Sequence, residues 1–368
     1  MKVLHVSSYC GHGGVETVLG ALISEQRKAG LDVEVFYFVN LGGAGHYENI
    51  CPVRFANQQP LTQLIVNGKY DLIHVVADAA HSAEKCLKRS LYKGPVVVTC
   101  HGSFTGNLNS NFVTAVSGYV ANRIQEQCPR PMHVVHNGVD TSVFYPPSHK
   151  QEGKPIIAWV GRSNDSFKDI GGLIALASSG IASDFKFIVV DGVHTDDNIR
   201  NWLPPDAEVI KRKPWNEMPD FYRSVAASEG FLLSTSRLEA CPMNILEAQA
   251  CGCPVIAPGV GGIPEIVEHE QTGFLYDREA GLSALNNAIS WLYRADNYGK
   301  VSEAAAQYVM QNFTASEMSS KYMDIYKSAI KTRRKSISNK IVQSALRLSM
   351  RLVKPSTTNK KRRVRKLQ

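Results

Sequence analysis

The stretch at 236–257, "SRLEACPMNILEAQACGCPVIA", decides the expected fold. The apolar runs "FLLSTS" before it and "PVIAP" at its end are typical of buried strands. Pro242 suits the first position of a helix, and "MNILEAQA" continues as helix. Strand, helix and strand in this order, with continuously apolar strands, predict a parallel sheet that helices cover on both faces.

The same alternation runs through the chain on either side of this stretch. In the first half, residues 15–30 have a helical pattern that Gly30 ends, and 79–93 have another. The segments that we expect to be strands are 2–9, 31–39, 71–77, 95–101 and 133–138 in the first half, then 156–162, 186–192, 230–236 and 254–258.

A stretch rich in proline and lysine, at 145–154, separates the halves and is the expected linker. The predicted fold class is therefore α/β, with two doubly wound Rossmann-like domains that face one another across a cleft at the carboxyl ends of their strands. We assign residues 1–147 to an N-terminal domain and 153–312 to a C-terminal domain. A helix at 313–330 is expected to pack back on the N-terminal domain, and 331–368 to form a basic tail.

Composition limits the function classes. The 368 residues, 44% hydrophobic and 20% charged, suit two globular domains. No stretch approaches the roughly 20 apolar residues of a membrane span, and the start has no secretion-signal pattern. The 8 cysteines include no CxxC pair, so buried, reduced thiols are favoured over a metal site at Cys251 and Cys253. We expect a cytoplasmic protein.

The net charge of +8 comes from the end of the chain. Residues 331–368 hold 14 of the 41 Lys and Arg and none of the 33 Asp and Glu, which leaves the first 330 residues mildly acidic. The acidic body argues against a nucleic-acid partner. In the tail, apolar residues recur at helical spacing with basic residues on the other face, a pattern typical of an amphipathic helix on an anionic membrane. The alternatives are a disordered solubilising tail and a nucleic-acid contact.

Four places carry candidate site residues. In "GHGGVET", Gly13 and Gly14 allow close backbone approach at a helix start whose N–H groups are open to a ligand. The motif is not GxGxxG, because Glu16 stands at the position of its third glycine. The alternative there is a plain strand-to-helix turn. His101 ends a buried strand on the cleft side, where a structural histidine is the alternative. On the loop "GRSNDSFKD", Arg162 and Lys168 suit a diphosphate, against the alternative of a solvated loop.

The opening stretch is the fourth place. The N–H groups of Met243 and Asn244 are expected to lie unbonded at the positive end of a helix, which favours a phosphate. Glu247, one turn further on, can accept hydrogen bonds from vicinal hydroxyls such as those of a ribose, and Glu239 can reach another part of the same ligand. This arrangement describes a nucleotide-sugar pocket, unless both glutamates are ordinary surface charges.

At these residues the chain resembles a retaining glycosyltransferase of the GT-B fold, of the large family 4 or group 1 type. The resemblance covers nearly all of residues 1–330, and it implies that 1–147 is the acceptor-side domain and 153–312 the nucleotide-sugar-binding domain. Its motifs are E-x7-E within "EACPMNILEAQACGCPVIA", then "GGIPEIV" and "TGFLY", with "GGVE", "HNGVD" and the Gly-Arg before Lys168 as weaker signals.

The resemblance implies roles for the candidate residues. Arg162 and Lys168 would hold the donor diphosphate, and Glu247 would bind the ribose. Glu239 would hold the transferred sugar, and His101 would sit beside its anomeric carbon. Further donor contacts would come from backbone groups of Gly13, Gly14, Ala240, Cys241, Pro242, Met243 and Asn244. The chain departs from the family where Ala240-Cys241-Pro242 replaces Gly-Phe-Gly, where Ser163 replaces leucine, and where Asp169 replaces glycine.

The expected reaction moves a sugar from a nucleotide-diphosphate sugar to a hydroxyl of a glycan or lipid-linked acceptor, in polysaccharide, lipopolysaccharide or glycolipid synthesis. The sequence has no Asp-x-Asp, so no metal and no other cofactor is expected. The alternatives are a nucleotide-sugar epimerase of the same fold and a non-catalytic sugar-nucleotide-binding protein. With the basic tail at 331–368, we expect peripheral attachment to the inner face of the cytoplasmic membrane.

Overall fold

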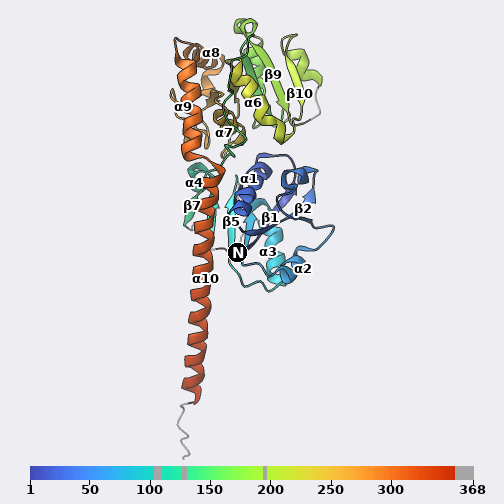
Figure 1. The fold of residues 1–368 in the computed structure, drawn as a ribbon, viewed down its shortest axis with the longest axis vertical. Helices are drawn as coiled ribbons and strands as arrows, with labels where there is room; N and C mark the ends of the chain where they lie inside the picture. The colour runs from blue at the N-terminus through green and yellow to red at the C-terminus, as the bar shows by residue number, and fades with distance from the viewer. Residues whose placement is uncertain (103–109, 111, 126–130, 194–196, 353–368) are drawn as a thin grey trace, which may run out of the picture.

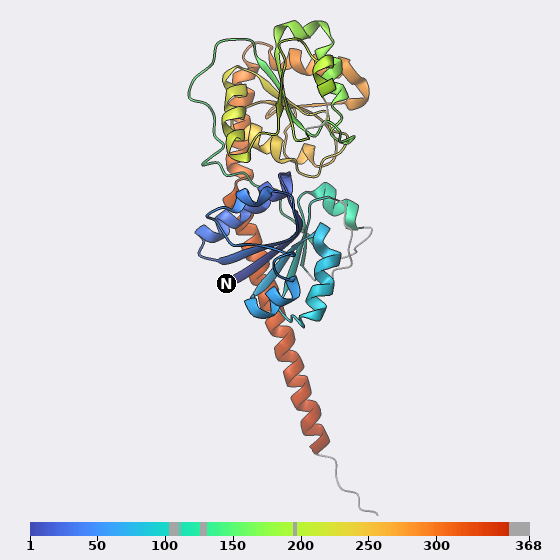
Figure 2. The same cartoon turned by 90° about the vertical axis from the view of Figure 1, so that its right-hand side faces the viewer.

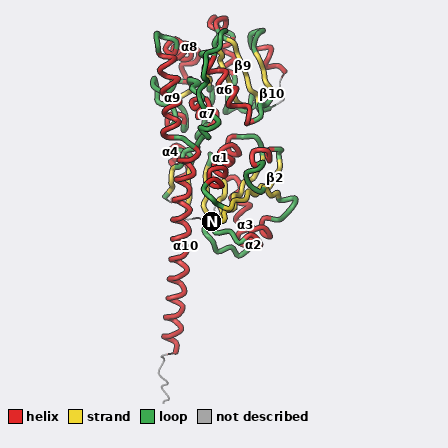
Figure 3. The backbone as a smooth tube through the Cα atoms, viewed as in Figure 1, coloured by secondary structure: helices red, strands yellow, loops and turns green. Residues whose placement is uncertain are grey.

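The structure, a computed structural model, describes residues 1–102, 110, 112–125, 131–193 and 197–352, with the backbone alone at 197–198 and from 337. The chain forms two α/β domains stacked one above the other (Figures 1 and 2). Helix, strand and loop alternate through both domains (Figure 3). The predicted fold class is therefore confirmed.

The N-terminal domain has a parallel sheet of order β3-β2-β1-β4-β5-β6-β7 in the described part of the chain. Its strands are β1 (Lys2–Cys10), β2 (Asp32–Asn40), β3 (Val53–Phe55), β4 (Leu72–Val76), β5 (Val96–Cys100), β6 (Phe112–Ala115) and β7 (Met132–Val134). Its helices are α1 (Gly14–Lys28), α2 (Leu61–Gly68), α3 (Ala80–Arg89) and α4 (Gly118–Gln125), with short 3-10 turns η1 (Gly43–Tyr47) and η2 (Ala77–Ala79). The order reverses between β1 and β4, and the carboxyl ends of two such strands are where open α/β sheets commonly bind ligands.

The C-terminal domain repeats the design with the sheet order β10-β9-β8-β11-β12-β13, again among the described residues. Its strands are β8 (Ile156–Gly161), β9 (Lys186–Asp191), β10 (Glu208–Lys211), β11 (Phe231–Leu233), β12 (Val255–Pro258) and β13 (Phe274–Tyr276). Its helices are α5 (Gly171–Ala177), α6 (Met218–Ala227), α7 (Met243–Ala250), α8 (Gly281–Leu292) and α9 (Asn297–Asn312), with η3 (Gly180–Asp184), η4 (Asp197–Trp202), η5 (Trp215–Glu217), η6 (Ile263–Glu265) and η7 (Arg278–Ala280). Trp159, Phe187 and Phe231 are among its fully buried side chains.

The two domains share buried apolar surface. One continuous cluster of buried side chains runs from the N-terminal core to the α6–α7 side of the C-terminal domain. The chain crosses between domains where Val139 pairs with Thr314, and the N–H of Val139 donates to the Phe313 carbonyl at 2.8 Å. These contacts join the two domains where the chain passes from one to the other.

The last helix, α10 (Ala315–Leu352), returns to the N-terminal domain and then extends beyond it (Figure 1). The fully buried hydroxyls of Tyr322 and Tyr326 contact Thr99 at 3.0 Å and the His74 ring at 2.7 Å. The helix has no end at residue 330, where we expected the packed helix to give way to a separate tail. No glycine or proline interrupts this segment, so the helix continues past the last core contacts.

The predicted tail beyond residue 352, and the side chains of the amphipathic pattern from Ile337 on, lie outside the described residues. Among the described residues, no helix is both long and apolar enough to cross a membrane.

Candidate active site

The opening stretch folds as β11, a loop, and α7. Pro242 is the N-cap of α7, with φ −71° and ψ 122°, so the helix begins at Met243, one residue later than expected. Its extended ψ angle keeps Pro242 outside the helix. The N–H groups of Met243 and Asn244 find no acceptor among the described residues, and both are available to a ligand at the positive helix end.

Lys168 and Glu239 form one ion pair at the edge of this loop. Their nitrogen and oxygen lie 2.6 Å apart, and the two side chains are 23% and 13% exposed. The Ser236 hydroxyl donates to the same Glu239 oxygen at 2.7 Å. Thr235 donates to the Lys168 carbonyl at 3.0 Å, which fixes the backbone below the ammonium group. The structure thus brings two predicted site residues together, with their charges matched and their positions defined.

Arg162 lies on the same loop as Lys168 but is more open. Its guanidinium contacts the Asp165 carboxylate at 2.5 Å, and its side chain is 60% exposed. Burial alone would raise the pKa of Asp165, but the hydrogen bonds from Arg162 and from the Phe167 N–H hold it below its usual value. Arg162 is therefore paired within its loop and free to turn toward a diphosphate.

The two departures on this loop have structural partners. The Ser163 hydroxyl donates to Asp191 at 2.6 Å, so a polar contact replaces the packing of a leucine. Asp169 has φ 45°, in the left-handed region that favours glycine. Its carboxylate accepts bonds from Arg237, at 3.0 Å, and from Arg278. These contacts offset the strained backbone of Asp169 and hold this residue in place directly after Lys168.

Glu247 lies on α7 and is only 5% exposed, so it is not an ordinary surface charge. Burial raises the pKa of its carboxyl to about 7, while the nearby Tyr222 hydroxyl opposes that shift. Tyr222, on α6, is itself completely buried. A buried carboxyl that is half ionised near neutral pH favours a ligand that donates hydrogen bonds to it.

The glycines of the N-terminal domain are placed differently from our expectation. Gly13 is the N-cap of α1, but its N–H donates to Glu16 at 3.1 Å, and Gly11 donates to the other oxygen at 2.9 Å. The Glu16 carboxylate therefore occupies the N–H groups of Gly11 and Gly13, which precede the helix, as the glutamate of a capping box does, and it leaves the N–H groups of the first helical turn unoccupied within the described part of the chain. Gly14 faces the other domain, since a Cβ there would lie 3.7 Å from Met243.

His101 follows β5 at the carboxyl edge of the N-terminal sheet, as expected. Its side chain is partly accessible, and burial lowers its pKa to about 4, so the ring is neutral at ordinary pH. Val76 pairs with Thr99, so Asp78 leaves β4 at the same level as His101 leaves β5. Burial raises the pKa of Asp78, against hydrogen bonds from Ser8 and Ala79. Asp78 was missed, although a carboxylate directly after a buried strand is a signal the sequence offers.

The cysteines of the opening stretch are buried thiols. Cys251 and Cys253 are fully buried, and burial raises the pKa of Cys251 to about 12. Burial likewise raises the pKa of Cys241 to about 12. Within the residues that the structure describes, no three His, Cys, Asp or Glu side chains cluster as metal ligands would.

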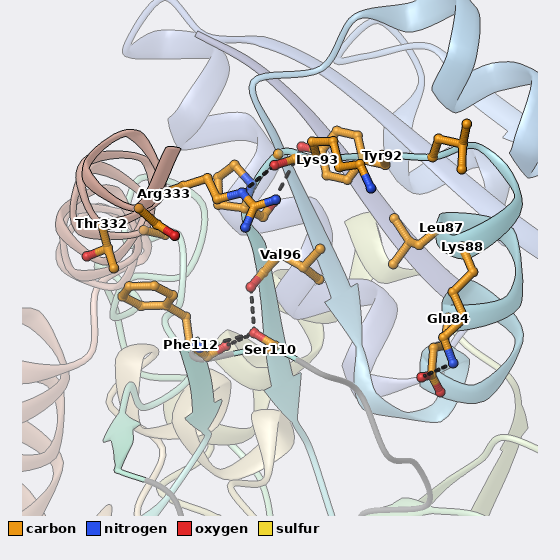
Figure 4. A pocket seen from close by; sticks show the side chains of 15 residues that line it. Glu84, Leu87, Lys88, Tyr92, Lys93, Val96, Ser110, Phe112, Thr332 and Arg333 are labelled. Carbon is orange, nitrogen blue, oxygen red and sulfur yellow. Dashed lines mark hydrogen bonds and ion pairs between the residues drawn. The ribbon is translucent and has the colours of Figure 1, made fainter. Parts of the chain in front are cut away.

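A separate pocket of about 410 Å³ lies at the opposite end of the N-terminal domain (Figure 4). It is formed where β5 begins, beside α3 and the exit of α10, and it contains none of the predicted donor-site residues. Lys88, Lys93 and Arg333 line it together with Leu91 and Phe112. Arg333 donates to the Lys93 carbonyl at 2.5 Å and so ties α10 to this rim.

Comparison with known proteins supplies the family. The model described as "Glycosyltransferase Family 4" matches residues 12–143, and "Glycosyl transferases group 1" matches 143–309. The chain belongs to the group 1 glycosyltransferases. The two matches divide this glycosyltransferase between its N-terminal and C-terminal domains, and the second contains the whole Lys168, Glu239 and Glu247 region.

Its relatives are distant. An uncharacterized glycosyltransferase of Methanocaldococcus jannaschii is 26% identical over 239 residues, 58% of this chain and 63% of that protein. The alpha-maltose-1-phosphate synthase of Mycobacterium tuberculosis is 28% identical over 294 residues, 70% of this chain and 73% of that protein. The crystal structure of Anabaena Alr3699/HepE in complex with UDP and glucose has a TM-score of 0.73 and 20% identity, and the similarity covers 89% of this chain and 100% of that one. This structural likeness shows that the glycosyltransferase has the GT-B fold.

Proposed function

We propose that this glycosyltransferase uses a nucleotide-diphosphate sugar and transfers the sugar, with retention of anomeric configuration, to a hydroxyl of a glycan or lipid-linked acceptor. The observation that carries the proposal is the arrangement around α7. A buried carboxyl lies on the helix, unbonded N–H groups lie at its start, and the Lys168–Glu239 pair lies before it. The complex of the structural neighbour HepE with UDP and glucose supports the same class of donor.

Each group has a defined task in this proposal. Glu247 accepts hydrogen bonds from the ribose hydroxyls, and Glu239 holds hydroxyls of the transferred sugar. The negative charge that grows on the leaving diphosphate is stabilised by Lys168 and the positive end of α7, which are already in place before reaction, and by Arg162 once it turns from Asp165 toward the diphosphate. His101 is neutral and lies beside the sugar as a hydrogen-bonding group.

Retention would follow from attack on the same face as the departing group, through an oxocarbenium-like state. The leaving phosphate takes the proton of the acceptor hydroxyl, so no separate base is needed on the opposite face. Because protein cations and N–H groups neutralise the diphosphate, we propose that transfer needs no metal ion.

The basic residues at the end of the chain suggest a location at a membrane surface. Arg333 of α10 lines the pocket together with Lys88 and Lys93 (Figure 4), and its neighbours in the sequence include three more cations, Lys331, Arg334 and Lys335. Near-surface cations contribute about 1 kcal/mol each to attraction by anionic lipids. We propose peripheral attachment at the inner face of the cytoplasmic membrane through 331–368, with a lipid-linked acceptor in polysaccharide or lipopolysaccharide synthesis.

A thermal-shift panel of nucleoside diphosphates and nucleotide sugars tests the proposed donor. A ligand that binds only the folded protein raises the midpoint of unfolding. One nucleotide and its sugar conjugate should raise the midpoint of wild type, and Glu247→Ala should abolish the shift. No shift with UDP, GDP, ADP or their sugars would contradict the proposed function. Product analysis without acceptor separates transfer from epimerisation, since an epimerase converts the sugar nucleotide alone.

Vesicle flotation tests the membrane attachment. Full-length protein should float with vesicles that contain anionic phosphatidylglycerol and not with neutral phosphatidylcholine, while a variant that ends at residue 330 should lose this binding. Equal binding by both forms would show that the tail has no such role.

A further inference from the structure

Glu265 contacts the other domain through both carboxylate oxygens. It ends η6, in the "GGIPEIV" motif of the C-terminal domain. One oxygen accepts the Gly118 N–H at 2.7 Å, and the other accepts the Tyr119 N–H at 2.8 Å, at the start of α4 in the N-terminal domain. The His136 ring nitrogen lies 2.9 Å from the carboxylate. Three groups of one domain thus meet a single side chain of the other.

This contact suits a negative charge. The two N–H groups lie at the positive end of α4, where they lack partners within the helix. Burial would raise the pKa of Glu265, but hydrogen bonds from Tyr119, His136 and Gly118 together keep it below its usual value.

The loop that carries Glu265 also holds the donor loop, residues 239–243. The Gly262 N–H donates to the Glu239 carbonyl at 2.9 Å. A Cβ at Gly261, which has φ 59°, would lie 2.1 Å from that same oxygen, and one at Gly262 would lie 1.8 Å from the Ala240 carbonyl. The two glycines therefore bring the loop into direct backbone contact with the donor loop.

Glu265 also lies beside the interdomain crossing. The His136 ring packs edge-on against Phe313, with centroids 5.6 Å apart. The next residue, Asn137, donates to the Cys241 carbonyl of the donor loop at 2.7 Å. The contacts between the donor loop and the N-terminal domain are thus grouped where the chain passes from one domain to the other.

We propose that Glu265 is a positioning residue for sugar transfer, which holds the donor loop in register with the N-terminal domain. Donor groups such as Lys168 and Glu247 lie in one domain, and His101 and the acceptor side lie in the other. A loop fixed to both keeps the transferred sugar aligned with the acceptor hydroxyl, where small misplacements cost large factors in rate. The inference rests on the proposed sugar transfer.

Substitution of Glu265 should separate binding from turnover. In Glu265→Gln the amide N–H₂ faces a backbone N–H donor in place of an acceptor oxygen, so one of the paired bonds is lost. The nucleotide is held by the C-terminal domain, so its Kd should stay within about twofold of wild type, whereas kcat should fall roughly 10- to 100-fold. Glu270→Gln, a neutralisation of an exposed glutamate on the same loop, should leave both unchanged.

The test measures the Kd of UDP, GDP and ADP, and the kcat for release of nucleoside diphosphate from their glucose conjugates. It also measures amide hydrogen exchange at residues 117–120. The proposal predicts unchanged Kd, lower kcat and faster exchange at 117–120 for Glu265→Gln alone. Wild-type kcat in this variant, or a Kd that rises while kcat falls, would overturn it. If Glu265→Gln does not fold, His136→Gln must lower kcat at unchanged Kd, by less than the fall expected for Glu265→Gln. Failure of wild type to bind any nucleotide would refute the proposed function instead, while the exchange measurement still tests the contact.

Discussion

Glu247 gives the proposed donor site a group whose protonation should change when nucleotide binds. Its pKa in the empty protein is raised to about 7 by burial, against a usual value of 4.5. Ribose hydroxyls that donate to the carboxylate favour its charged form and lower the pKa again. Nucleotide binding should therefore release a proton wherever the empty site is still protonated.

The magnitude follows from the two pKa values. At pH 6.5 a group of pKa 7 is about three-quarters protonated, so a return to its usual pKa releases about 0.75 proton per nucleotide bound. At pH 8.5 the release falls to roughly 0.03 proton. If only the charged form binds, the Glu247-dependent part of the affinity should be about 30-fold greater at pH 8 than at pH 5.5.

Isothermal calorimetry with UDP, or with the diphosphate that gives the largest thermal shift, measures the release in two buffers of different ionisation enthalpy. The matched control is Glu247→Gln, which keeps the shape of the side chain and cannot titrate. The difference in proton release between wild type and variant should be near 0.75 at pH 6.5 and near zero at pH 8.5. Equal release by both proteins at pH 6.5 would refute the assignment of Glu247 to the ribose.

Three further predictions concern the buried groups that support the site. Tyr326→Phe removes the hydroxyl that contacts His74, and it should destabilise the protein by about 1–3 kcal/mol, seen as a lower unfolding midpoint. His5 has a pKa lowered to about 4 by burial, so its neutral form stabilises the fold above pH 6.5 and this stability is lost as the pH falls toward 4. His5→Asn should therefore show a smaller drop in unfolding midpoint between pH 7 and pH 5 than wild type, and an equal drop would contradict this. Gly262→Ala places a Cβ 1.8 Å from the Ala240 carbonyl, so donor turnover should fall by orders of magnitude in a protein whose circular dichroism is unchanged; wild-type turnover would contradict it.

The fold class could be predicted from the sequence because most of the strands have their own local signal, whereas the short strands β3, β6, β10 and β13 were not expected. Apolar strands, the helix stop at Gly30 and the restart of the pattern after 145–154 all depend on neighbouring residues. The extent of α10 was not predicted correctly, since the change in charge at residue 331 suggested a boundary that the backbone does not have. A change in surface charge does not end a helix, whereas a glycine or proline does.

The site was predictable only in part, because its contacts join residues that are far apart in the sequence. Lys168 and Glu239 are 71 residues apart, and their contact follows from the sheet order that brings β8 beside β11. The bonds from the Gly11 and Gly13 N–H groups to Glu16 were not predicted, because the glycine spacing alone does not show where the Glu16 side chain turns. The Glu265 contact joins residues 129 to 147 positions apart in two domains, and no local pattern reports such a pairing.

Donor turnover by two single variants tests the central claim most directly. Release of nucleoside diphosphate from the sugar nucleotide that most stabilises wild type is measured for Lys168→Ala and Glu247→Ala, with exposed Lys300→Ala on α9 as control. The account predicts that both site variants stay folded and lose turnover by orders of magnitude while the control keeps wild-type rates. Wild-type turnover in either folded site variant would contradict it.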